Sequence, residues 1–249
     1  VDVRYIRTAD GYTTGTAFVM YYSSGARQFI FHLRHSAAGQ LCPDDVDEHY
    51  IGSSKVVHIM GSSLAVSESS MKACYKAAET ASNSGVTVTF DPNLRPELLD
   101  VETIRRICEP VLRLSYAVFP SKDEATALTG ATDPVEAGRS LLRLGPKVAV
   151  LKMGAQGAVA VTEDETVFEP AFTIREVDPT GAGDIYDAAF VYGMLRRWTL
   201  SKTLEFASAA GAMKATRFGP MSGPTSTREV EYFIRNTPKK RPPADASRH

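Results

Sequence analysis

The sequence predicts an α/β fold, in which a mainly parallel sheet is covered by helices on both faces. Three observations predict this class. From about residue 55 onward, short β-branched runs alternate with longer segments of helical period. The runs are apolar almost throughout, which is typical of strands buried on both faces of a parallel sheet. The chain has 249 residues, 43% of them hydrophobic and 23% charged, and this composition suits one globular domain.

The N-terminal part departs from this pattern and predicts a small β lid within about residues 13–40. Residues 16–22 and 28–31 are rich in aromatic and β-branched side chains, and a Ser-Ser-Gly turn separates them without an intervening helix. We therefore expect a hairpin that forms a flap beside the main sheet.

The main body is predicted to be a βαβ series in three layers. Strands are expected at residues 55–60, 86–90, 116–119 and 147–152. Helices are expected between and after them, at residues 68–83, 101–114, 133–144, 185–198 and 207–218. We expect a single domain over residues 1–237. Residues 238–249 combine prolines and charge with almost nothing apolar, which predicts a disordered tail.

Charge and cysteine content exclude several classes of protein. Lys and Arg number 28 against 29 Asp and Glu, so no uniform basic field favours a nucleic-acid partner. No apolar run approaches the roughly 18 residues that span a bilayer, and residues 1–10 lack a secretory pattern. We expect a cytoplasmic protein without a membrane partner. The three cysteines lack the spacing of a metal or disulfide site. Because the chain opens at Val1, we expect an upstream segment in the complete protein.

Polar segments follow three of the predicted strands, at the edge of a parallel sheet where ligands bind. These segments are DPNLRP at 91–96, PSKDE at 120–124 and KMGAQG at 152–157. The sequence therefore predicts a ligand site built from strand ends.

The strongest motif is DPTGAGD at 178–184, which runs directly into an apolar helical segment. A small-residue loop at a helix start presents main-chain N–H groups and the positive end of the helix dipole to an anion such as phosphate. Gly181 and Gly183 allow close approach. Asp184 has two interpretations: it favours the helix dipole, or it takes a proton from a hydroxyl beside the anion site. The motif is neither a P-loop nor a dinucleotide-binding fingerprint.

Four segments together resemble the ribokinase-like (PfkB) carbohydrate kinase family. They are DPTGAGDIYDAAF at 178–190, LKMGAQGA at 151–158, FDPNLRP at 90–96 and PSKDEA at 120–125. The resemblance extends from about residue 13 to residue 235. It implies a three-layer α/β/α sandwich with a β lid, and the ATP-dependent transfer of a γ-phosphate to a sugar hydroxyl.

By this resemblance, Asp184 is the general base, and Gly181, Ala182 and Gly183 form an anion hole for the γ-phosphate. Phosphoryl transfer depends mainly on positioning and charge neutralisation, which agrees with these assignments. Arg95 would meet phosphate or the sugar acid; a surface or structural ion pair is the alternative.

The resemblance also assigns the nucleotide side of the site. Lys152, Gly154 and Gly157 match the family's nucleotide-side strand and turn, although the glycines could serve a hairpin turn alone. Glu124 matches the glutamate of an Asn-x-x-Glu element, which is associated with Mg²⁺ and phosphate through water. Ser121 stands where that element usually has Asn.

Two further assignments concern the C-terminal half. Gly211 and Lys214 lie where small residues of a helix surround the adenine in relatives, although Ala and Gly also serve close helix packing. Asp178 and Thr180, with carbonyls near Gly219, resemble a monovalent-cation loop that would hold K⁺ in some members.

Substrate recognition is assigned to the first half of the chain. Arg34, in FIFHLRHSAA at 29–38, is similar to the arginine that binds the substrate carboxylate in 2-keto-3-deoxygluconate kinases, although the spacing to Ser36 differs. Asn93 is assigned to the substrate side and, with Asp91, to holding its loop; turn-forming chemistry is the alternative. An acidic sugar, 2-keto-3-deoxygluconate, is the favoured substrate, and fructose is next.

The resemblance leaves alternatives open. The family normally has a longer N-terminal section than precedes residue 13 here, so the domain is expected to be N-terminally incomplete. A non-catalytic or truncated nucleotide-binding protein on the same fold, and a nucleoside kinase of the family, remain alternatives. The aromatic lid strand also suggests a homodimer formed through the lid.

Overall fold

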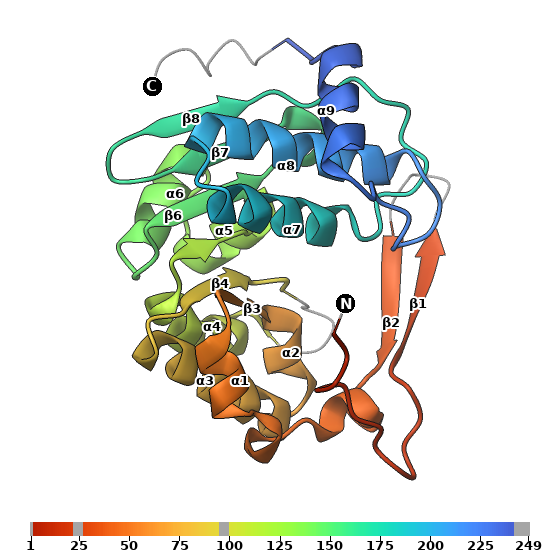
Figure 1. The fold of residues 1–249 in the computed structure, drawn as a ribbon, viewed down its shortest axis with the longest axis vertical. Coiled ribbons are helices and arrows are strands. Elements are labelled where there is room, and N and C mark those ends of the chain that lie inside the picture. Colours follow the sequence, from red (N-terminus) through yellow and green to blue (C-terminus); the bar gives the residue numbers. More distant parts are fainter. Residues whose placement is uncertain (1, 22–26, 95–99, 242–249) are drawn as a thin grey trace. The chain divides into compact units, whose positions relative to one another are not determined.

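The computed structural model describes residues 2–21, 27–94 and 100–241. It divides into two compact units, Val1–Tyr116 and Ala117–His249 (Figure 1).

The first unit opens with the predicted hairpin. Strands β1 (Thr16–Tyr21) and β2 (Arg27–His32) pair antiparallel, with Phe18 opposite Ile30. Both of these side chains are exposed, at 62% and 52% of their surface. The separate two-stranded lid predicted from the sequence is confirmed.

The rest of the first unit alternates helices with two strands. In chain order these are η1 (Ala37–Gln40), η2 (Pro43–Asp45), α1 (Glu48–Ser53), β3 (Val56–Met60), α2 (Gly61–Val66), α3 (Glu68–Asn83), β4 (Thr87–Asp91) and α4 (Val101–Leu114). Strands β3 and β4 are parallel, with Ile59 opposite Phe90. Helix α3 begins where Ser67 accepts a hydrogen bond from the Ser70 N–H, which satisfies one of the unpaired amides of the first turn.

The second unit carries the remaining elements. They are β5 (Ala117–Val118), α5 (Lys122–Thr129), α6 (Pro134–Leu142), β6 (Val148–Lys152), η3 (Gly154–Gln156), β7 (Ala158–Val161), β8 (Thr166–Glu169), α7 (Ala182–Leu195), α8 (Leu200–Ala215) and α9 (Thr227–Asn236). Within this unit the strand order is β5-β6-β7-β8. Strands β5 and β6 are parallel, whereas β6, β7 and β8 form an antiparallel meander.

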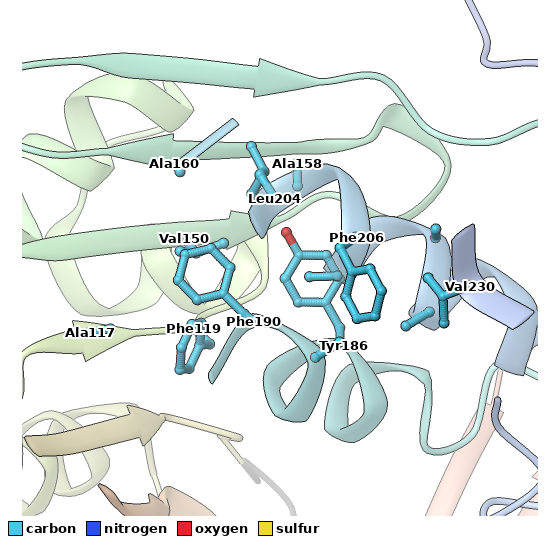
Figure 2. Packing of buried hydrophobic residues seen from close by; sticks show 14 of the residues in the cluster. Ala117, Phe119, Val150, Ala158, Ala160, Tyr186, Phe190, Leu204, Phe206 and Val230 are labelled. Atoms are coloured by element: carbon cyan, nitrogen blue, oxygen red, sulfur yellow. The ribbon is translucent and has the colours of Figure 1, made fainter. Parts of the chain in front are cut away.

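Helices cover both faces of this sheet, as expected. Side chains alternate between the faces of a strand. Val150 and Ala160 belong to a buried cluster with residues of α7 and α8, in which Phe119 and Phe190 meet edge to face at 5.3 Å (Figure 2). On the other face, α6 approaches so closely that a Cβ on Gly138 would lie 2.6 Å from a Val161 methyl group. The predicted α/β class with helix, sheet and helix layers is confirmed.

The C-terminal segment differs from the prediction of a tail from residue 238. Thr173 N–H donates to the Pro238 carbonyl and Lys240 N–H to the Ala171 carbonyl, both at 2.8 Å. The Lys239 ammonium pairs with Glu169 at 2.8 Å and with Glu205 at 2.6 Å. Main-chain pairing and these ion pairs hold residues 238–240 although their side chains are not apolar. Residues 242–249 lie outside the described part of the chain.

In residues 2–21, 27–94 and 100–241, no helix is both long and apolar enough to cross a membrane.

Candidate active site

The centre of the site is the start of helix α7, which forms because Gly181 accepts a left-handed backbone. Gly181 is the N-cap at φ 81°. A Cβ there would lie 2.3 Å from the Pro220 carbonyl oxygen, so only glycine fits between the two loops. Ala182 and Gly183 follow as the first helical residues. The Ala182 N–H donates to the Pro179 carbonyl at 3.0 Å and is therefore already engaged in the turn, while the small size of both residues leaves the helix start accessible.

A cavity of about 280 Å³ opens beside this helix start, within the second unit. It brings together six residues that the sequence predicted for the anion and nucleotide sites: Lys152, Gly154, Gly157, Ala182, Gly183 and Gly211. Apolar side chains, among them Phe172 and Ile174, form much of the remaining wall. The arrangement suits a ligand with a flat apolar part and a charged end.

Gly211 serves both packing and the cavity. It lies on α8, and a Cβ there would lie 3.2 Å from the Ala182 carbonyl oxygen and 3.5 Å from Tyr186. The two interpretations given for this glycine are therefore compatible, since close helix packing is what places it at the cavity.

Asp184 occupies the first turn of α7, one residue beyond Gly183. Its side chain is exposed and does not enter the apolar core. This placement leaves the carboxylate accessible to a substrate, which a general base requires.

Lys152, at the end of β6, forms a buried ion pair across the cavity wall. Its ammonium donates to both carboxylate oxygens of Asp187, at 3.0 and 3.1 Å. The Asp187 side chain is only 2% exposed and that of Lys152 15%. The ammonium lies 3.6 Å from the position that a Gly183 Cβ would take, so a fixed positive charge lies beside the helix start.

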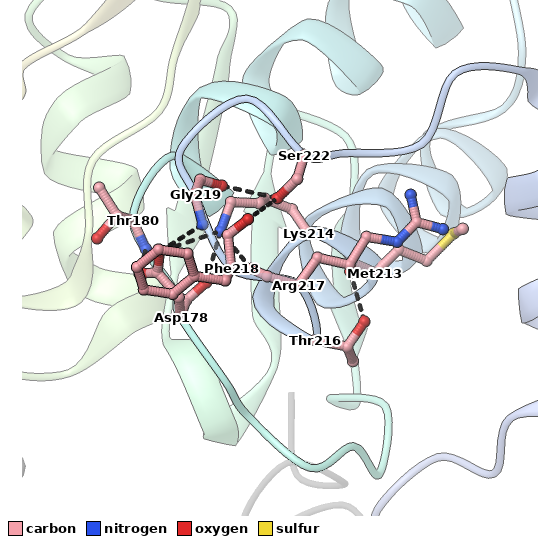
Figure 3. Close-up of polar contacts among 9 residues, drawn as sticks. All are labelled: Asp178, Thr180, Met213, Lys214, Thr216, Arg217, Phe218, Gly219 and Ser222. Atoms are coloured by element: carbon pink, nitrogen blue, oxygen red, sulfur yellow. Dashed lines mark hydrogen bonds and ion pairs between the residues drawn. The ribbon is translucent and has the colours of Figure 1, made fainter.

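A second polar network joins the loop before α7 to the loop after α8 (Figure 3). The Asp178 carboxylate accepts hydrogen bonds from the Thr180 N–H at 2.9 Å and the Gly219 N–H at 3.0 Å. Burial acts to raise the pKa of Asp178, but these hydrogen bonds and the nearby Lys214 ammonium outweigh it and lower the pKa to about 2. Asp178 is therefore a stable anion that joins two loops.

Lys214 belongs to this network and not to the cavity. Its side chain is fully buried, and its ammonium donates to the main-chain carbonyls of Asp178 at 2.6 Å and Arg217 at 3.1 Å. The prediction that Lys214 contacts the nucleotide is corrected, because the ammonium points into the two loops. The sequence placed Lys214 on a helix of small residues near the site, but it did not reveal where the lysine side chain points.

Ser121 and Glu124 form a capping box at the start of α5. The Ser121 hydroxyl accepts from the Glu124 N–H at 3.3 Å, and the Glu124 carboxylate accepts from the Ser121 N–H at 2.7 Å. Ser121 also bridges to Lys152 in parallel register, which sets this helix start beside the end of β6. In the described residues, no cluster of three or more His, Cys, Asp and Glu side chains could hold a metal ion.

Residues 1–228 match the family model described as "pfkB family carbohydrate kinase". The chain belongs to this family. Members that phosphorylate sugars are phosphotransferases with an alcohol acceptor, and the predictions of family and enzyme class are confirmed.

Two curated relatives illustrate the range of this pfkB family. The chain is 34% identical over 239 residues to a 2-dehydro-3-deoxygluconokinase of Thermoproteus tenax, covering 94% of this chain and 72% of that protein. It is 30% identical over 230 residues to a fructokinase of Klebsiella pneumoniae, covering 89% and 74%.

A solved structure matches the fold of this pfkB kinase. It is a putative ribokinase II from E. coli in complex with ATP and Mg²⁺, with a TM-score of 0.83 and 36% identity, covering 90% of this chain and 72% of that one. The predicted ribokinase-like fold is therefore confirmed.

The first unit of this pfkB kinase holds the residues predicted for the substrate side. Arg34 is exposed in the segment after β2. Asn93 follows β4 with φ 39°, and its N–H donates to the buried Asp91 carboxylate at 3.0 Å, which is the turn-forming geometry given as the alternative. Arg95 lies outside the described residues.

Sequence reasoning missed Asp187, although one signal pointed to it. Asp187 lies within residues 185–195, whose other side chains are almost all apolar, and a helix that is apolar on most of its surface is expected to bury most of its side chains. A carboxylate there requires a cation, and Lys152 ends the strand that leads to the same site. Pairing the two required knowing that β6 and α7 are neighbours.

Proposed function

We propose that the protein is an ATP-dependent kinase that transfers the γ-phosphate of ATP to a hydroxyl of a sugar acid, 2-keto-3-deoxygluconate in the first place. The observation that carries the proposal is the cavity at the start of α7, which joins an apolar wall to a helix N-terminus and a fixed ammonium. Fructose is the next substrate to test.

The cavity fits the two ends of a nucleotide. Phe172, Ile174 and Ala212 provide apolar surface for a base, and its volume of about 280 Å³ lies near the lower end of small-molecule sites. Lys152 and the N-terminal end of helix α7 at Gly183 would provide the positive end that phosphates require. The E. coli relative in complex with ATP and Mg²⁺ supports this assignment.

Asp184 would act as the general base. As the acceptor oxygen attacks the γ-phosphorus, its proton passes to the Asp184 carboxylate, the bond from phosphorus to the bridging oxygen breaks, and ADP leaves with that oxygen. The N-terminal end of helix α7 at residues 181–183 would stabilise the charge on the moving phosphoryl group, together with Lys152. The exposed position of Asp184, next to a glycine of the cavity wall, supports this role.

Glu124 is the residue that would hold Mg²⁺, through a water molecule. Mg²⁺ in phosphoryl-transfer sites keeps several waters and binds few protein carboxylates, so one carboxylate beside the end of β6 fits that donor set. When bound, the ion would neutralise charge on the phosphates.

Arg34 would bind the carboxylate of a sugar acid. Its guanidinium is exposed, and a bidentate pair with a carboxylate is the interaction that this group favours. The 2-dehydro-3-deoxygluconokinase relative supports an acidic sugar, and the fructokinase relative supports a neutral one as the alternative. Asn93, and Arg95 beyond the described residues, stay assigned to the substrate side and to the phosphate.

ADP release measured over a panel of sugar acids, hexoses and nucleosides tests the proposal. We expect turnover with a sugar acid, and a loss of about 10²- to 10⁴-fold in kcat for Asp184→Asn. Asp164→Asn, which makes the same change on an exposed turn, is the control and should keep wild-type turnover.

Two results would redirect the proposal. ATP binding in calorimetry without product from any panel member would support the non-catalytic alternative, which Ser121 in place of the usual Asn already favours. Turnover with a nucleoside alone would support a nucleoside kinase.

The lid would join two copies of this chain. Phe18 and Ile30 lie opposite each other across the hairpin and expose more than half of their surface, which is costly for a free strand pair. A dimer mass in light scattering that becomes a monomer mass in Phe18→Lys would support this interface, and a wild-type monomer at micromolar concentration would refute it.

A further inference from the structure

The ammonium of Lys214 lies at the point where two loops of the second unit meet. The lysine belongs to the last turn of α8, and its side chain has no exposed surface. The Nζ donates to the Asp178 carbonyl at 2.6 Å and to the Arg217 carbonyl at 3.1 Å (Figure 3). It also lies 3.9 Å from a carboxylate oxygen of Asp178. The group is thus a cation surrounded by main-chain and carboxylate oxygens.

The same loops reach the anion site directly. Asp178 accepts from the Gly219 N–H, and the Pro220 carbonyl lies against Gly181, where no side chain would fit. The loop after α8 therefore holds the loop before α7 at both ends of the segment 178–181. A group that fixes the position of the loop before α7 therefore also fixes the main chain at the start of α7.

Main-chain carbonyls and a carboxylate are the ligands that alkali cations take, and a monovalent cation was predicted at Asp178 and Thr180. The donor set of this chain does not fit an added ion. Two of the carbonyls already accept from an ammonium, and a second positive charge on the same oxygens would be repelled at short range in a buried site.

We propose that the Lys214 ammonium takes the place of a bound K⁺: it is a covalently attached cation that holds the loop before α7, so that this enzyme needs no monovalent cation. Lys214 is a positioning residue in this account, since it acts on the phosphate site through the main chain of Asp178. For its activity readout the inference rests on the proposed function.

A purely structural role is the competing explanation. Lysine near a helix C-terminus commonly donates to the last carbonyls, as Lys214 does to Arg217. Such a cap would leave the protein indifferent to which cation is present, both in the wild type and after the lysine is removed. A response to a specific cation in a variant therefore separates the two explanations.

The experiment compares the wild type with Lys214→Ala in potassium chloride and in choline chloride at equal ionic strength. We expect the wild-type melting temperature to be the same in both salts, and the ADP affinity and kcat to agree within about twofold. In choline, Lys214→Ala should lose roughly tenfold or more in kcat/KM, because buried oxygens and a carboxylate lose their cation. Added K⁺ should restore both melting temperature and turnover saturably.

Lys202→Ala is the matched control, because it removes an exposed lysine from the same helix. It should show no difference between potassium and choline.

Three outcomes would overturn the inference. One is a wild type whose melting temperature and turnover rise with K⁺ but not with choline. Another is a folded Lys214→Ala that responds identically to both salts. If Lys214→Ala does not fold in either salt, Lys214→Ser replaces it, because its short side chain also vacates the position of the ammonium, and a failure of K⁺ to raise its melting temperature counts against the inference. Should the wild type turn over no substrate, the proposed function fails, while melting and ADP binding still test the role of Lys214.

Discussion

Two lysine–aspartate pairs of the second unit support the start of helix α7 from different sides, and they differ in what they present to a ligand. Lys152 keeps 15% of its side chain exposed and lines the cavity, with both oxygens of Asp187 holding its ammonium. Lys214 is fully buried, and its ammonium donates hydrogen bonds to main-chain carbonyls. The first pair places a charge at the site, whereas the second shapes the backbone that forms it.

The largest effect should follow from removing the charge that faces the cavity. Lys152→Met leaves the Asp187 carboxylate buried without its cation, which should lower the free energy of unfolding by about 3–5 kcal/mol. We also expect a loss of about 10²-fold in kcat/KM for ATP, since a charge-stabilising group is gone.

The double variant Lys152→Met, Asp187→Asn separates these two effects. Urea unfolding should show much of the stability restored, while ADP release stays low. Recovery of turnover together with stability would mean that Lys152 only neutralises Asp187 and takes no part in phosphate binding.

The second-largest effect is expected from a change in the backbone of the loop before α7, at Gly181. Gly181→Ala must adopt a φ of 81° and would place its Cβ 2.3 Å from the Pro220 carbonyl oxygen. We expect a loss of about 3 kcal/mol in thermal or urea unfolding, and a weaker affinity for ADP in calorimetry. Gly154→Ala is the control: its φ is also positive, at 53°, but no atom lies within 4 Å of an added Cβ, so only about 1 kcal/mol should be lost. Equal losses in both variants would show that the contact with Pro220 is unimportant.

The smallest effect appears as a dependence on pH. The pKa of Asp178 falls from 3.8 in its ordinary state to about 2 in the folded protein, so the folded state binds this proton less readily. Its contribution is present above the ordinary pKa and is lost as the pH falls from about 5 to 2, and it amounts to about 2 kcal/mol.

Urea unfolding at several pH values should therefore show a steeper loss of stability in acid for the wild type than for Asp178→Asn. Parallel curves would mean that Asp178 is not held as an anion by the two loops.

Local patterns were enough to predict much of this fold. Apolar runs located β3, β4 and β6, because burial on both faces leaves its mark on a strand's own sequence. Helical periods located α3, α4, α6, most of α7 and the second half of α8, whereas α1, α2, α5 and α9 were not predicted. The Ser-Ser-Gly turn between two aromatic and β-branched runs predicted the lid, because a hairpin is specified by residues that are close in the sequence. The glycines at 181 and 183 predicted a helix start that presents its amides.

What the sequence did not reveal depends on contacts between distant segments. The partner of Asp187 is 35 residues away, and Lys214 reaches a carbonyl 36 residues away. Strands β7 and β8, which continue the sheet as an antiparallel meander after β6, were not predicted. The short pairing of residues 238–240 has no apolar signature at all.

That pairing bears on where the chain can be shortened. Secondary structure alone suggests a cut after α9, which ends at Asn236. Lys240, however, lines the cavity at the start of α7 and donates to the Ala155 carbonyl at 3.2 Å, and Lys239 is the cation beside Glu169. A truncation at residue 237 would therefore remove part of the cavity wall and leave the buried Glu169 carboxylate without its lysine partner. An affinity tag or crystallisation boundary therefore belongs beyond residue 241.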